Sequence, residues 1–165
     1  MKSPPALIIA YGNPQRGDDG LAWYAADELE KALSPPEVQI VRCHQLAPEL
    51  AEHFTACDAV IFIDAAAPQG KKRRPGEIHF EEIDAHAAAE LGTPALGHQF
   101  SPAALVALAD QIYHVTPRAF CVTLTGESFD HGESLSATVS SALPELIVRV
   151  KTLIEEVATN WADKI

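Results

Sequence analysis

The sequence lacks a long apolar run, a cysteine framework and an excess of positive charge. None of its apolar stretches approaches the roughly 20 residues that a membrane-spanning helix needs. Its three cysteines lie far apart and form no C-x-x-C pair, which argues against disulfides and against a zinc or redox motif. The formal charge of −11 argues against a nucleic-acid partner. The short apolar run at residues 6–10 ends without a cleavage site, so we expect a cytoplasmic protein.

Several nucleotide-binding and hydrolase motifs are also missing. The chain has no G-x-G-x-x-G, no P-loop and no G-x-S-x-G nucleophile elbow, so a phosphate cradle and a serine nucleophile both find little support. The only basic cluster is the run Lys-Lys-Arg-Arg at residues 71–74, which precedes Pro75-Gly76. We interpret this run as a solvated turn, and a docking patch for an acidic partner is the alternative.

Strand-like and helix-like segments alternate along the chain. The run at residues 59–64 is continuously apolar, as a central strand covered on both faces should be. Ser101-Pro102 matches the preferred start of a helix, and Pro144 is expected to kink or break the last one. The expected strands are 6–11, 38–43, 59–64, 76–83 (at an edge) and 120–125. The first expected helix begins at residue 18 or 19 and ends near 33, and the others span 47–57, 102–113 and about 134–157. A polar loop is expected from 84 to about 99.

This alternation predicts an α/β fold in a single domain over residues 1–165. We expect three layers: a twisted, mostly parallel sheet of about five strands with helices on both faces. In such sheets, binding sites form beyond the carboxyl ends of the strands. Polar clusters follow three of the expected strands: residues 12–20 with the pair Asp18-Asp19, Asp64 at the end of its strand, and Gly126-Glu127-Ser128.

Two carboxylates and one imidazole from these regions could form a metal site. Asp19, Asp64 and His98 are a plausible set of ligands for a divalent transition metal, with further positions left open. Helix capping requires only one of the two adjacent aspartates, which leaves the other for a site. His44 directly follows a strand and is a candidate neighbour of this site. Each residue also has an ordinary structural interpretation, so their shared location carries the argument.

The ordered motifs resemble those of the hydrogenase maturation proteases. Residues 7–20 (LIIAYGNPQRGDDG) are similar to the opening of that family, and residues 60–65 (VIFIDA) are similar to its second acidic motif. Gly97-His98-Gln99 resembles the family's His-Gln motif, and residues 126–136 resemble its C-terminal signature. The sequence departs from the family pattern at Ala22, at Leu96-Gly97 and at residues 44–46. The resemblance covers nearly the whole chain.

The resemblance implies an aspartic-type family endopeptidase. Such an enzyme removes the C-terminal extension of a [NiFe]-hydrogenase large-subunit precursor after nickel insertion. By position, Asp19, Asp64 and His98 would be both the catalytic and the nickel-binding residues, and the precursor would supply the nickel. The metal could polarise the scissile carbonyl or activate water, or one carboxylate could act as a general base. Two alternatives are a non-enzymatic nickel-sensing chaperone or scaffold, and a small-molecule hydrolase on a similar α/β fold.

Overall fold

The structure is a computed structural model that describes residues 6–34, 37–90 and 100–163. Its centre is a five-stranded sheet with the strand order β2-β1-β3-β5-β4. The first four strands in that order are parallel, and β4 at the edge runs antiparallel to β5. The strands are β1 (Ala6–Tyr11), β2 (Val38–Cys43), β3 (Ala59–Ala66), β4 (Ile78–Ile83) and β5 (Arg118–Thr125).

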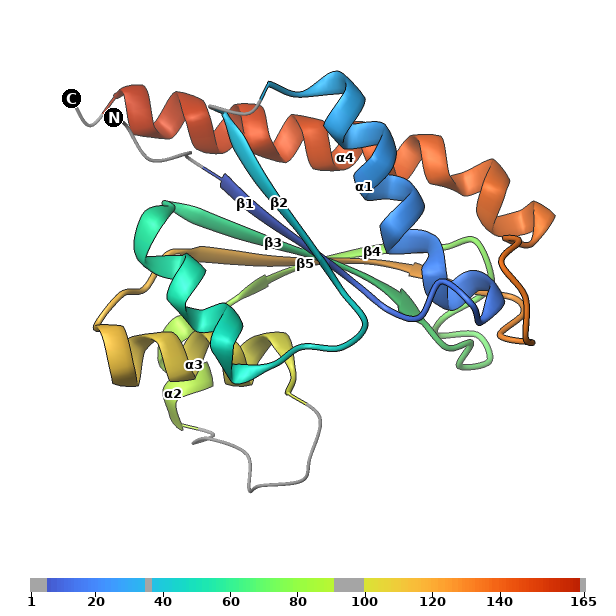
Figure 1. Ribbon diagram of the computed structural model, residues 1–165, viewed down its shortest axis with the longest axis horizontal. Coiled ribbons are helices and arrows are strands. Elements are labelled where there is room, and N and C mark those ends of the chain that lie inside the picture. The colour runs from blue at the N-terminus through green and yellow to red at the C-terminus, as the bar shows by residue number, and fades with distance from the viewer. Residues whose placement is uncertain (1–5, 35–36, 91–99, 164–165) are drawn as a thin grey trace.

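Helices cover both faces of this sheet, which confirms the predicted three-layer α/β fold (Figure 1). One face packs against α1 (Leu21–Ala32) and α4 (Ala137–Ala162). The opposite face packs against the 3-10 helix η2 (Pro48–Ala56) and α3 (Pro102–Tyr113). A short helix, α2 (Ala85–Glu90), lies beside α3.

Strands β1 and β3 form the centre of the core because their side chains are apolar on both faces. Ile8 and Ile61 point toward α1 and α4, and Leu7 and Phe62 point toward η2 and α3. All four side chains are fully buried. Complete burial of one such side chain stabilises the fold by about 1.5–3 kcal/mol. Strands β1 and β3 are therefore firmly held, and they position the residues at their carboxyl ends.

Local signals set the start of α3 as the sequence predicts. The Ser101 hydroxyl accepts a hydrogen bond of 3.1 Å from the Ala104 N–H, and Pro102 occupies the first turn. The helix ends at His114, whose φ of 54° is left-handed. These caps satisfy backbone groups that the helix itself cannot pair.

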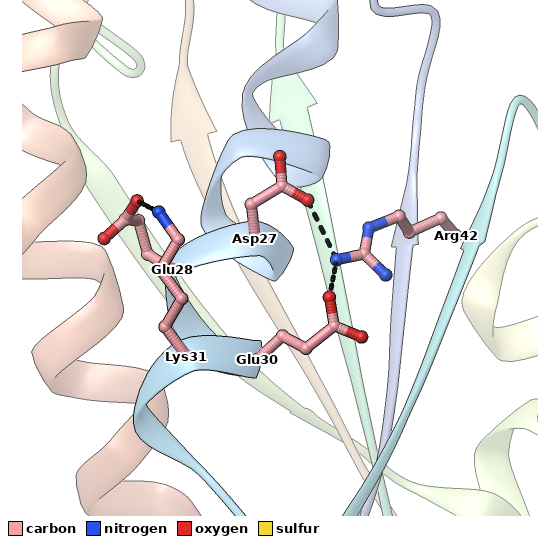
Figure 2. Close-up of polar contacts among 5 residues, drawn as sticks. All are labelled: Asp27, Glu28, Glu30, Lys31 and Arg42. Atoms are coloured by element: carbon pink, nitrogen blue, oxygen red, sulfur yellow. Dashed lines mark hydrogen bonds and ion pairs between the residues drawn. The ribbon is translucent and has the colours of Figure 1, made fainter.

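An arginine ties α1 to strand β2 at the surface. Arg42 on β2 places one guanidinium nitrogen 2.9 Å from Asp27 and 2.9 Å from Glu30, and both carboxylates belong to α1 (Figure 2). On the side of the same helix that faces α4, Lys31 pairs with Glu28 at 2.8 Å. The Arg42 side chain is mostly buried, so its paired contacts orient α1 more firmly than an exposed pair would.

The structure corrects several boundaries. The segment predicted to be a helix at 47–57 is a 3-10 helix, and the segment from 84 onward begins with helix α2 instead of a loop. Asp64 lies inside β3, two residues before its end, because pairing with β5 continues to Ala66. Helix α4 continues past Pro144 without a break. The first predicted helix is divided into the 3-10 turn η1 (Gly17–Gly20) and α1.

Membrane insertion finds no support in the described residues, because none of their helices combines the length and the apolar character of a membrane span. The cytoplasmic location expected from the sequence stays a prediction.

Candidate active site

A tight corner after β1 carries Asp19 back beneath the end of that strand. Gly12 has a φ of 142°, and a Cβ at this position would lie 2.1 Å from the Asp19 carbonyl oxygen. Only glycine allows this close approach of the two backbone segments. The Gly12 N–H also donates to the Cys43 carbonyl at 3.1 Å, which joins the corner to β2. The Asn13 N–H then donates to Asp19 Oδ2 at 2.8 Å and orients the carboxylate.

Asp18 has a different, structural position. Its side chain is fully buried and accepts hydrogen bonds of 2.7–2.9 Å from the N–H groups of Glu127, Ser128 and Ser136 and from the Ser136 hydroxyl. Burial alone would raise the pKa of Asp18, but these donors outweigh it and lower the pKa. Asp18 therefore ties the loop after β1 to the segment after β5, and it does not cap a helix as the sequence suggested.

Asp64 projects from β3 beside the end of β1, on the face that packs against η2 and α3. Burial raises the pKa of Asp64 to about 6, and the charge of Asp19 adds to that increase. The Tyr11 hydroxyl and the Ala65 N–H donate toward the carboxylate and oppose part of the shift. Burial and the adjacent Asp64 raise the pKa of Tyr11, so its hydroxyl stays protonated as a donor.

Asp19 and Asp64 line one small, polar pocket at the carboxyl edge of the sheet. The pocket has a volume of about 220 Å³. Its lining consists of Tyr11, Gly12, Asp19, His44, Gln45, Leu46, Asp64, Ala65 and Phe100. Both carboxylates therefore line one pocket, and their predicted roles there stay predictions. A larger hollow of about 620 Å³ between α1 and α4 is lined by exposed charged and apolar side chains and lies away from both carboxylates.

His44 lines the same pocket, and its ring packs against that of Trp23. The rings of His44 and Trp23 meet edge-on, with centroids 5.5 Å apart. Trp23 Nε1–H donates to the carbonyl oxygens of Gly12 at 3.1 Å and Cys43 at 3.3 Å, which joins the ends of β1 and β2. Neither Tyr11 nor Trp23 was predicted from the sequence, although the aromatic residue directly before Gly12-Asn13 is a signal for Tyr11.

The third predicted ligand, His98, lies outside the described residues. Among the residues that the structure does describe, no group of three or more His, Cys, Asp or Glu side chains could hold a metal ion. Asp19 and Asp64 supply hard oxygen ligands, and the imidazole of His44 is beside them in the pocket. The two carboxylates alone suit a cation whose remaining ligands come from elsewhere.

The segment after β5 packs around Asp18 and donates hydrogen bonds to it. Gly126 packs so closely that an added Cβ would lie 2.6 Å from the Phe129 ring and 3.0 Å from the Asp18 Cβ. The Ser128 hydroxyl faces Asp130 at 3.4 Å.

Comparison with known proteins gives similarity in structure alone. No family model and no curated protein matches this sequence. The solved hydrogenase maturating endopeptidase HybD from E. coli matches with a TM-score of 0.70 and 21% identity, covering 92% of each chain. The [NiFe] hydrogenase maturation protease HycI from Thermococcus kodakarensis KOD1 matches with a TM-score of 0.71 and 19% identity, over 93% of this chain and 94% of that one.

A further solved structure gives the same result. The [NiFe] hydrogenase maturation protease HybD from Thermococcus kodakarensis matches with a TM-score of 0.66 and 19% identity, over 90% of this chain and 98% of that one. These matches extend over nearly the full length of both chains. The chain has the fold of solved hydrogenase maturation endopeptidases.

Proposed function

We propose that this chain is an endopeptidase that removes the C-terminal extension of a [NiFe]-hydrogenase large-subunit precursor after nickel insertion. The observation that carries the proposal is the convergence of Asp19 and Asp64 on one polar pocket. The chain shares its fold with solved hydrogenase maturation endopeptidases and proteases. The sequence motifs that place an aspartate at each of these positions resemble the same family.

In this proposal, Asp19 and Asp64 contact the nickel that the precursor carries, and His98 is the third contact. The nickel is part of the substrate, and its positive charge fixes the precursor in the pocket. Asp19 is oriented for this role by the Asn13 N–H, and Asp64 is oriented by Tyr11. Hydrolysis adds water to the scissile carbonyl, breaks the C–N bond and delivers a proton to the leaving amine. The metal could polarise the carbonyl or activate the water, or one carboxylate could instead accept the proton from water.

Mass spectrometry of a nickel-loaded precursor, before and after incubation with the purified chain, tests the proposal. We expect the precursor to lose the mass of its C-terminal extension. The variant Asp64→Asn should leave the precursor whole. Asp58→Asn is the matched control, because Asp58 is exposed and directly precedes β3 at the opposite end from Asp64. This variant should cut the precursor normally. A stable complex with an uncut precursor would identify a non-enzymatic nickel-sensing chaperone instead.

A further inference from the structure

A row of polar side chains crosses the sheet beyond the pocket. Asp64 on β3 pairs in register with Thr123 on β5, and Thr123 pairs with His79 on β4. Residues paired in this way point to the same face of a sheet. That face is the one on which Phe62 packs against η2 and α3. The polar site therefore continues from Asp64 toward the β4 edge.

Arg73 reaches this row from the turn between β3 and β4. Its Nη1 donates to Thr123 Oγ1 at 3.0 Å, one strand away from Asp64, and its side chain is partly buried. The turn itself is ordered by backbone hydrogen bonds: Gln69 N to Arg73 O at 2.9 Å, and Gly76 N to Thr125 O at 2.8 Å. The solvated turn expected from the sequence is thus wrong for Arg73, which is directed onto the sheet.

The polar groups gathered here have unused hydrogen-bonding capacity. A guanidinium has five N–H donors, and in residues 6–34, 37–90 and 100–163 no carboxylate lies within ion-pair distance of Arg73. His79 Nε2 is buried without a hydrogen-bond partner in the same residues, with a Glu77 oxygen 3.5 Å away. Thr123 accepts from Arg73, so its own O–H can still donate.

Arg73 has no ion-pair partner among the described residues, although the chain has 23 acidic and only 12 basic residues. Acidic side chains were available to neutralise Arg73, yet none in the described part of the chain does so. Its charge also acts on this face: Arg73 opposes the effects of burial, Asp64 and Glu81, which together raise the pKa of Cys121 to about 12. An arginine fork in such a position binds a carboxylate through two parallel hydrogen bonds.

We propose that Arg73, with Thr123 and His79, forms a carboxylate-binding subsite that holds an acidic side chain of the peptide substrate next to the pocket. This inference rests on the proposed function for the identity of its substrate. Lys71, Lys72 and Arg74 are exposed around Arg73 and extend the positive charge along the turn. Charge spread in this way fits an acidic segment of extended peptide better than a single terminal carboxylate.

Nuclear magnetic resonance of the ¹⁵N-labelled full chain at low ionic strength tests the subsite directly. The probes are three short peptides: an acetylated and amidated peptide with two glutamates between glycines, the same peptide with glutamines, and acetylated tetraglycine with a free carboxyl end. The glutamate peptide should shift the Arg73 Nε–H and Thr123 amide signals in a saturable way. The glutamine peptide should cause no shift, and the tetraglycine acid should bind more weakly.

Three variants complete the test: two that remove one positive charge and one that keeps it. Arg73→Gln should weaken binding of the glutamate peptide by about tenfold or more, the loss expected for one charge-assisted contact. Lys71→Gln removes the same charge from the exposed tip and should change affinity less than about twofold. Arg73→Lys keeps the charge but lacks the guanidinium fork, so its affinity for the glutamate peptide should lie between those of Arg73→Gln and Lys71→Gln. Unchanged melting temperatures would show that each variant is folded.

Specific outcomes would overturn the subsite. Equal losses in Arg73→Gln and Lys71→Gln would mean diffuse surface charge, and equal binding of tetraglycine acid would mean that an acidic side chain is not what it selects. An absent Arg73 shift would remove the subsite altogether. Because these measurements involve no cleavage, they are separate from the proposed function. Glutamate-peptide binding without cleavage of any nickel-loaded precursor would refute the protease and retain the subsite.

Discussion

Asp18 and Asp19 are adjacent, but their carboxylates point into different surroundings. Asp18 is buried among donors from two distant segments, and Asp19 lines the pocket with one backbone donor. The residue with more hydrogen bonds stabilises the fold, and the residue with free oxygen lone pairs is available to a ligand. Substitutions at the two positions should therefore have separable effects on stability and on activity.

Replacing Asp18 should destabilise the protein strongly. Asp18→Asn places an amide N–H₂ against donors and removes charge-assisted hydrogen bonds, so the free energy of unfolding should fall by at least about 3 kcal/mol. Urea unfolding measures this loss. Asp130→Asn, an exposed neighbour in the loop that Asp18 holds, should change stability by less than about 0.5 kcal/mol. Equal effects of the two would contradict the anchoring role.

The stability contributed by Asp18 should also depend on pH. Its pKa is lowered in the folded state, so its contribution is fully present above the unfolded pKa of about 3.9 and is lost as pH falls through the folded value. The stability difference between wild type and Asp18→Asn should shrink in acid. If the stability difference between the two proteins stays constant across that pH range, the hydrogen bonds do not depend on the ionised form of Asp18.

Substitutions of the pocket carboxylates should impair activity without destabilising the fold. Asp19→Asn, Asp64→Asn and His98→Ala should each suppress tail removal while the chain remains folded, and His44→Ala should have a smaller effect. The raised pKa of Asp64 means that its ionised form is unfavourable in the fold, so Asp64→Asn should gain about 1–3 kcal/mol at neutral pH. Precursor cleavage and urea unfolding, measured side by side, check both effects. An Asp64→Asn variant that still cuts fully would exclude this carboxylate.

At the scale of elements, the corner between β1 and η1 decides where Asp19 lies. Gly12→Ala should cost at least about 3 kcal/mol or abolish folding, because a Cβ would meet the Asp19 backbone at 2.1 Å and the backbone has a φ of 142°. Gly70→Ala is the control, since Gly70 also has a positive φ, of 53°, but its Cβ would meet no atom within 4 Å. The control should lose only about 1 kcal/mol. Thermal unfolding of both variants distinguishes the steric contact from the dihedral cost.

For the whole molecule, we expect nickel in the precursor to be the condition for cutting. Asp19 and Asp64 are too few ligands to hold a metal ion alone, and no third ligand joins them within the described ranges. Thiolates of the loaded precursor can complete the coordination. The nickel-containing precursor should therefore be cut, and the same precursor assembled without nickel should not.

Two controls belong to the nickel experiment. A short peptide that spans the cut site should be inert because it cannot present the metal. Serine-protease reagents should have no effect, since no serine has a role in the proposed site. Gel electrophoresis of each reaction measures the outcome. Efficient cutting of the nickel-free precursor would overturn nickel recognition, although the chain could still be a protease.

Sequence patterns by themselves determined the strands, most of the helices and the sheet edge at which Asp19 and Asp64 lie. The apolar run in β3 and the Ser101-Pro102 start of α3 are local signals, because burial and capping act on neighbouring residues. Parallel strands bring their carboxyl ends to one edge. The positions of Asp19 after β1 and of Asp64 near the end of β3 therefore predicted that both would lie at that edge.

Tertiary structure decided which of two adjacent aspartates faces the pocket and where Arg73 points. Asp18 is buried because donors from residues 127–136 reach it, and no local pattern encodes contacts with residues more than 100 positions away. Arg73 stands in a run of four basic residues that look alike in sequence. Only the register of β3, β5 and β4 places Thr123 beneath Arg73 and beside Asp64, because strand pairing is set by the packing of the whole sheet.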